Sequence, residues 1–170
     1  MIILPLALML AAYIFKALGM YTIAEQRRID YPWLAWVPVA NGWLLGCISD
    51  QYRYVTRGES RKLRTVLVVF PVIEAVLAIA VFAAAAGSLI AGGEVINTAT
   101  VIISILLSLV RLTHYMIEQA ATFDLHRSCN PETAVLFLVL GLIVPGLRSV
   151  FLFANWEQEL GMPPRKVTAV

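Results

Sequence analysis

The sequence predicts an all-α, polytopic integral membrane helical bundle, formed by a single domain over residues 1–170. Hydrophobic residues make up 60% of the chain, whereas soluble domains average about 45–50% apolar residues. Two long hydrophobic blocks, Thr65–Ala91 and Val95–Ile117, are separated only by Gly92-Gly93-Glu94. A membrane-spanning helix needs about 20 predominantly apolar residues. Each block is therefore long enough to cross a bilayer, and together they predict a helical hairpin.

Three to five transmembrane helices are expected along the chain. Three spans are predicted at residues 2–20, 65–91 and 95–117. Two further hydrophobic stretches, 33–49 and 133–154, are interrupted by proline and glycine, which disfavour a continuous helix. Each of these two stretches is expected either to cross the membrane or to form a re-entrant or interfacial segment.

The N-terminal stretch lacks the pattern of a cleaved signal peptide. Such a peptide starts with a positively charged region and ends at a small-residue cleavage site. No Lys or Arg precedes Lys16. We therefore expect the first span to be retained.

Positive charge is concentrated in one part of the sequence. Seven of the 13 Lys and Arg residues lie between Arg27 and Arg64, and none lies between Thr65 and Val110. Cytoplasmic loops carry an excess of Lys and Arg. The basic segment 57–64 is therefore predicted in the cytoplasm of a cell, with the N-terminus outside. Anionic lipid explains this charge better than nucleic acid, so the lipid bilayer is the expected partner.

The chain carries no familiar catalytic or cofactor motif. It has no G-x-S-x-G, no Walker A sequence and no G-x-G-x-x-G. Cys47 and Cys129 lack C-x-x-C partners and are expected to serve as small packing residues. No catalytic residue, cofactor or metal is assigned, and a non-enzymatic role is favoured.

Glu74 is the sharpest candidate for a functional residue. It is the one charged residue in the block 65–91, and it lies about 14 Å along a helix from the start of that block. An ionised carboxylate in the membrane is costly, so Glu74 is expected to be protonated or paired. Arg111 on the antiparallel arm is the expected partner. The two residues are interpreted as a proton- or cation-coupling site or as a structural ion pair.

His114 and Glu118 form a second candidate pair. Their i, i+4 spacing places both side chains on one helix face, where they can bind a metal or transfer a proton. Asp124, His126 and Cys129 lie downstream, but no H-E-x-x-H or paired Cys/His spacing accompanies them. The alternative is that these residues are polar because the helix leaves the membrane there.

Small residues recur every four positions along the first arm of the hairpin. They are Ala80, Ala84, Ser88 and Gly92. This spacing puts small side chains on one helix face, where another helix can approach closely. Packing within the same chain is favoured, and the alternative is an interface in a homo-oligomer or with another membrane protein.

Several strings in the sequence are similar to a group of small, uncharacterised bacterial multi-pass membrane proteins. These strings are Tyr21–Ala24, Trp33–Asn41, Ile48–Tyr52 and Gly161–Arg165. The W-x-x-W-x-P-x-x-N pattern within the second string also resembles a wider set, in which W-x-x-x-I-P-x-x-N follows the first span. The resemblance implies a location in a bacterial cell membrane and carries no activity.

Three functions remain open from the sequence. The favoured one is a non-enzymatic accessory or interaction subunit. The second is a small proton- or ion-coupled transporter or channel component that uses Glu74 and Arg111. The third is a metal-dependent membrane enzyme that uses His114 and Glu118.

Overall fold

A computed structural model describes residues 3–59, 62–91 and 97–155. Within these ranges the chain forms six α-helices and one 3-10 helix, and no strand, which confirms the predicted all-α class. The elements are α1 (Ile3–Gln26), η1 (Pro32–Trp36), α2 (Ala40–Arg57), α3 (Leu63–Ile90), α4 (Thr98–Cys129), α5 (Ala134–Ile143) and α6 (Pro145–Ala154). The hairpin turn Gly92-Gly93-Glu94 and the C-terminal string Gly161–Arg165 lie outside the described residues.

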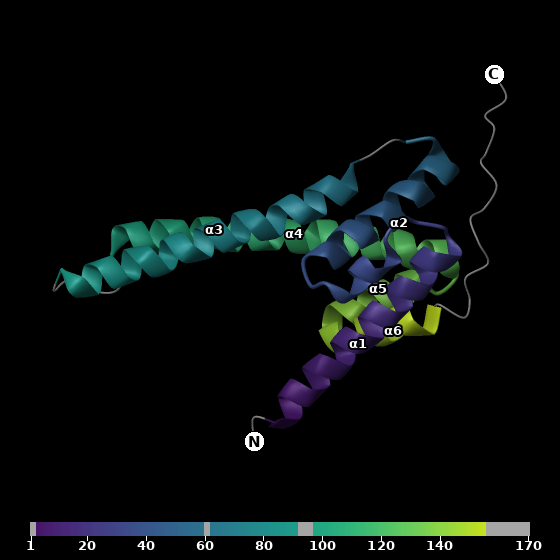
Figure 1. Ribbon diagram of the computed structural model, residues 1–170, viewed down its shortest axis with the longest axis horizontal. Helices are drawn as coiled ribbons and strands as arrows, with labels where there is room; N and C mark the ends of the chain where they lie inside the picture. Colours follow the sequence, from purple (N-terminus) through teal and green to yellow (C-terminus); the bar gives the residue numbers. More distant parts are fainter. Residues whose placement is uncertain (1–2, 60–61, 92–96, 156–170) are drawn as a thin grey trace.

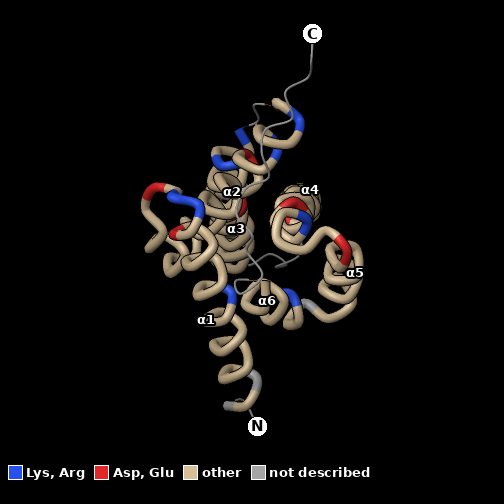
Figure 2. The backbone as a smooth tube through the Cα atoms, turned by 90° about the vertical axis from the view of Figure 1, so that its right-hand side faces the viewer, with Lys and Arg blue, Asp and Glu red and all other residues tan. Residues whose placement is uncertain are grey.

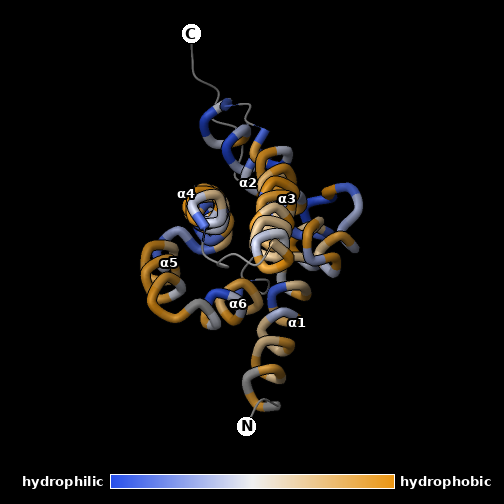
Figure 3. The backbone as a smooth tube through the Cα atoms, turned by 90° about the vertical axis from the view of Figure 1, so that its left-hand side faces the viewer, coloured by the Kyte–Doolittle hydropathy of each residue, from blue (hydrophilic) through white to orange (hydrophobic). Residues whose placement is uncertain are grey.

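The molecule consists of a broad bundle and a protruding hairpin. Helices α3 and α4 run side by side, and their outer halves project away from the other helices (Figure 1). The remaining helices gather around the C-terminal half of α4 and the first turns of α3. Hydrophobic residues dominate α3, α5 and the N-terminal half of α1, whereas the end of α2 is hydrophilic (Figure 3).

Helices α1, α3 and α4 are long and apolar enough to cross a membrane. Large side chains on α3 face outward: Ile79 is 68% exposed and Phe82 is 76% exposed. A continuous apolar face of this kind is stable against lipid and unfavourable in water. The predicted transmembrane character is thereby confirmed. Helix α1 continues to Gln26 and α4 to Cys129, beyond the predicted spans 2–20 and 95–117.

The stretch predicted at 33–49 divides into two elements. The 3-10 helix η1 ends at Trp36, and α2 begins at Ala40 beyond Pro38. Helix α2 continues to Arg57, beyond the end of the predicted hydrophobic stretch at residue 49. Its second half is polar and lies outside the predicted hydrophobic stretch, but it packs on α3 and α4 and stays helical.

The stretch predicted at 133–154 is broken between α5 and α6. Each of these helices has 10 residues, which corresponds to about 15 Å. That length is half of a hydrocarbon core of about 30 Å, so neither helix crosses a bilayer by itself. Helix α5 packs against α4, and α6 returns to pack against α1. The chain therefore changes direction at the Pro145 break.

The hydrophobic core lies where α1, α2, α4, α6 and the first turns of α3 meet. Its largest members are completely or almost completely buried, and each of the five helices contributes at least one of them. They are Met20, Ile23, Leu44, Leu45, Ile48, Leu67, Leu125 and Leu152. The core thus sits in the bundle, and the outer half of the hairpin lies beyond it.

Helices α2 and α3 meet backbone to backbone at Gly46. A Cβ atom added to Gly46 would lie 2.4 Å from the Cα atom of Arg64. One turn further along α2, the Asp50 carboxylate accepts hydrogen bonds from the backbone N–H groups of Leu63 (3.1 Å) and Arg64 (3.3 Å). Asp50 therefore satisfies free donors at the start of α3, and the close contact at Gly46 holds it in place.

Replacing Gly46 with alanine should destabilise the protein by about 1–3 kcal/mol, because the new methyl group meets backbone that cannot rotate away. Gly87→Ala is the matched control. Gly87 lies in α3 with no atom within 4 Å of the added Cβ position, so this change should stabilise the helix by about 0.5–1 kcal/mol. Reversible unfolding in mixed detergent measures both changes. A Gly46→Ala protein as stable as Gly87→Ala would contradict the contact.

Candidate functional site

Glu74 on α3 is paired with His114 on α4. The Oε1 atom of Glu74 lies 2.6 Å from Nδ1 of His114, and the ring of Phe70 stacks on the imidazole with centroids 5.7 Å apart. Arg111 is the more distant partner, with its Nε 4.0 Å from Oε2 of Glu74 and a side chain that is 62% exposed. Glu74 is thus paired as the sequence predicts, but mainly by His114, because that side chain lies between the two arms.

Glu118 belongs to a separate, half-buried cluster. Its Oε1 atom accepts a hydrogen bond from Nζ of Lys16 on α1 (3.1 Å) and another from Nη2 of Arg148 on α6 (2.5 Å). The sequence analysis did not select Lys16 or Arg148 as site residues. The available signal was that each is an isolated cation within an otherwise apolar stretch, a pattern typical of intramembrane functional residues.

A cavity of about 320 Å³ joins these two clusters, and we call it the central cavity. His114 and Glu118 lie about one turn apart on α4, and both side chains line it. Helices α1, α2 and α3 and the segment before α2 supply the other walls. The lining residues are Tyr13, Lys16, Pro38, Val39, Asn41, Gly42, Leu67, Pro71, His114 and Glu118. Two of the four polar residues predicted from the sequence, His114 and Glu118, therefore line this cavity. A third, Glu74, contacts His114 beside it.

Proline and glycine shape the wall formed by α2 and α3. Pro71 lies inside α3 and has no N–H, so the carbonyl of Leu67 lacks its usual helical donor. A Cβ atom added to Gly42 would lie 3.1 Å from that carbonyl oxygen. Gly42 therefore lets α2 approach the point where the α3 hydrogen-bond ladder is interrupted.

Asp124 and His126 have structural partners on other helices. The Oδ2 atom of buried Asp124 accepts hydrogen bonds from Oγ of Ser49 (2.6 Å) and Nε of Arg53 (2.5 Å), both on α2. His126 bonds through Nδ1 to Asn155 (2.5 Å). Among the described residues, no group of three or more His, Cys, Asp or Glu side chains is arranged to hold a metal ion. His114 and Glu118 instead bond to different partners.

The row of small residues on α3 is half-buried at Ala80, Ala84 and Ser88. Ser88 accepts a hydrogen bond from the side-chain amide of Asn97 (2.8 Å), the residue that precedes α4. This end of the row therefore lies at the contact between the two arms. Gly92, the fourth member, is outside the described residues.

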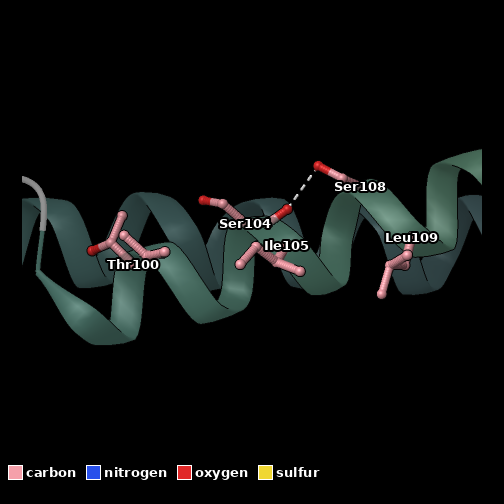
Figure 4. A pocket seen from close by; sticks show the side chains of 6 residues that line it. Thr100, Ser104, Ile105, Ser108 and Leu109 are labelled. Carbon is pink, nitrogen blue, oxygen red and sulfur yellow. Dashed lines mark hydrogen bonds between the residues drawn. The ribbon is translucent and has the colours of Figure 1, made fainter.

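A second hollow, of about 420 Å³, lies along the outer half of α4 (Figure 4). Its lining residues are Thr100, Val101, Ser104, Ile105, Ser108 and Leu109. The Ser108 hydroxyl donates to the carbonyl oxygen of Ser104 in its own helix (2.8 Å). No ionisable side chain lines this hollow, so the central cavity is the better candidate for chemistry.

Comparison of the chain with protein-family models, curated proteins and solved structures finds no match. The arrangement of charges therefore carries the functional argument. Charged positions are absent from the N-terminal half of α1 and reappear where this helix joins the bundle (Figure 2). Of the charged side chains on α1, α4 and α6, Lys16 and Glu118 line the central cavity, and Arg148 contacts Glu118.

Removing the Asp124 carboxylate should destabilise the fold strongly. Asp124→Ala leaves Arg53 with a side chain only 13% exposed and without its carboxylate partner, and breaking a buried ion pair in this way costs about 3–5 kcal/mol. Glu25→Ala, at an exposed position on α1, should change stability by no more than about 0.5 kcal/mol. Reversible unfolding in mixed detergent measures the free energy of unfolding of the Asp124→Ala and Glu25→Ala proteins. Equal stabilities would show that the Asp124 network does not hold α2 against α4.

Proposed function

We propose that the protein is a small proton-coupled transport component of a bacterial cell membrane. The observation that carries this proposal is the 2.6 Å contact between Glu74 and His114 inside the transmembrane hairpin, beside a polar cavity. In the proposed orientation the N-terminus lies outside and the basic segment 57–64 lies in the cytoplasm. The central cavity holds the solute, and the Glu74–His114 pair holds the proton.

A carboxylate and an imidazole in contact form a suitable proton-binding unit. An imidazole nitrogen can carry a proton, and a carboxylate at hydrogen-bonding distance can accept a hydrogen bond from it. The side chains of both residues are about one-fifth exposed, so the proton is held in a poorly hydrated environment. Intramembrane Glu and His residues with these properties mark proton relays and substrate pathways.

The position of His114 links the proton to the cavity. Its Nδ1 atom contacts Glu74, and its side chain also lines the central cavity. A change in the charge of the pair therefore acts directly on whatever occupies the cavity. Coupling of this kind requires that two ligands affect one another's binding free energy, which their shared contact with His114 provides.

An accessory or interaction subunit is the second candidate. It is favoured by the outer half of the hairpin, where large apolar side chains face outward and the other described helices make no contact (Figure 1). Such a surface suits another membrane protein as well as lipid. This candidate assigns Glu74 a structural role, so it predicts that proton flux does not depend on the Glu74 carboxylate.

Glu74→Gln should slow proton flux on the order of a hundredfold, the loss typical when a proton-transfer group is removed. Proteoliposomes that contain a trapped pH-sensitive dye and receive a proton gradient measure this rate. Glutamine keeps an oxygen acceptor for His114, which preserves the local packing. Arg57→Gln, at an exposed position on α2 outside the site, is the matched control. Equal acidification rates in all three proteins would remove the transport proposal and leave the accessory subunit.

Cysteine labelling in intact cells tests the proposed orientation. A membrane-impermeant maleimide should label Ala91→Cys at the outer end of α3 and leave Glu25→Cys at the inner end of α1 unlabelled until the cells are opened. The native thiols interfere little at neutral pH, because Cys129 is buried and burial raises the pKa of the Cys47 thiol to about 11. The reverse labelling pattern would invert the orientation.

A further inference from the structure

We propose that the central cavity binds a small carboxylate anion together with a proton, with the anion against the ammonium group of Lys16. This inference rests on the proposed transport function and names its class of solute. It follows from three features of the cavity. They are the balance of charges around it, the hydrogen-bonding groups available on its walls, and the dependence of the His114 imidazole on protonation.

The charge balance of the Glu118 cluster favours a negative ligand. Lys16 and Arg148 supply two positive charges to a single carboxylate. The side chains of these two cations are only 19% and 13% exposed. A buried charge without a counter-charge is unfavourable in an apolar setting. One further negative charge in the cavity balances this cluster.

The walls of the cavity mainly offer hydrogen-bond donors. Glu118 already accepts from two cations, and Glu74 is engaged by His114. A lysine ammonium has three N–H groups, of which Lys16 directs one to Glu118. The Asn41 side chain adds a further amide at the cavity wall. A ligand that accepts hydrogen bonds through two oxygens matches these groups.

His114 makes anion binding depend on a proton. A neutral imidazole that donates through Nδ1 to Glu74 keeps a lone pair on Nε2, whereas a protonated imidazole has an N–H there. Because Nδ1 is occupied by Glu74, Nε2 is the ring nitrogen left for the cavity. Protonation therefore turns an acceptor into a donor and adds a positive charge. The anion and the proton then strengthen each other's binding.

The charged groups around His114 lie on α1, α3, α4 and α6. Glu74 on α3 and Arg111 on α4 lie on the hairpin side. Across the cavity stand Lys16 on α1 and Glu118 on α4, with Arg148 on α6 behind them. Near His114 itself, the carboxylate of Glu74 is the closest charged group. We expect anion affinity to rise as pH falls.

The volume of the cavity limits the size of the anion. Ligand pockets commonly measure about 300–1,000 Å³, and the central cavity, at about 320 Å³, lies at the small end of that range. It suits a carboxylate with a short carbon chain and excludes a lipid or a nucleotide.

Fluorine NMR with two isosteric probes tests this inference on the full-length protein in phosphatidylcholine nanodiscs. Trifluoroacetate carries a negative charge, and trifluoroacetamide has the same shape without it. The trifluoroacetate signal should broaden and saturate on titration, and the affinity of the protein for trifluoroacetate should be higher at lower pH, because a protonated His114 adds a donor and a positive charge. Trifluoroacetamide should bind at least about tenfold more weakly. Equal affinities for the two probes would overturn the inference.

Two substitutions should shift the affinity in opposite directions. Lys16→Met removes the ammonium and should weaken trifluoroacetate binding about tenfold or more. Glu118→Gln removes the competing carboxylate, releases Lys16 and should tighten binding. A misfolded protein cannot give tighter binding, so the Glu118→Gln result separates a specific effect from loss of structure. Arg57→Gln, outside the cavity, should bind as the wild type does. Unchanged affinity in both cavity variants would exclude this site.

The binding and flux experiments test the anion site and the proton coupling separately, so either proposal can be rejected without the other. Anion binding that is specific but independent of pH, with flux unaffected by Glu74→Gln, would keep the anion site and remove proton coupling. Flux that depends on Glu74 without any preference for trifluoroacetate over trifluoroacetamide would keep coupling and reject a carboxylate as the solute.

Discussion

The pairing of buried polar side chains on α4 determines how the bundle is assembled. Polar groups removed from water need partners, and in an apolar environment those partners must come from the protein. His114 contacts α3, Glu118 contacts α1 and α6, and Asp124 contacts α2. Each polar residue of α4 thus positions a different neighbour. Apolar side chains fill the space between these helices.

The polar contacts of α4 differ in their relation to the central cavity. Asp124 is buried among α2 side chains, away from the cavity lining, and its contacts serve to hold two helices together. His114 and Glu118 reach partners on other helices and still border open space. Paired polar side chains on α4 therefore serve two purposes. Asp124 makes a purely structural contact, whereas His114 and Glu118 remain accessible to a ligand. That difference explains why a site can exist in so small a bundle.

Local sequence patterns account for the helices that depend mainly on their own composition. The hydropathy of α3 and α4 is enough to define the hairpin, and Pro145 with its neighbouring glycine is enough to define the break before α6. The continuation of α2 to Arg57 was not predictable in this way, because its polar half is held by Asp124, far away in the sequence.

The candidate site was predictable only in part for the same reason. Glu74, His114 and Glu118 stand out because polar residues are rare in hydrophobic blocks. Lys16 is separated from Glu118 by 102 residues, and no periodicity within α1 points to that contact. The cavity itself depends on how four helices are placed, and that placement is set by long-range pairing.

The protrusion of the hairpin beyond the bundle gives the molecule an uneven cross-section along its length. At the level of the core, all six helices lie close together; further out, only α1 and the two arms of the hairpin continue, and they diverge (Figure 1). The outer halves of α3 and α4 therefore have only each other as neighbours among the described helices (Figure 1). Their relative position there depends on the contact between the two arms and on the molecules that surround them.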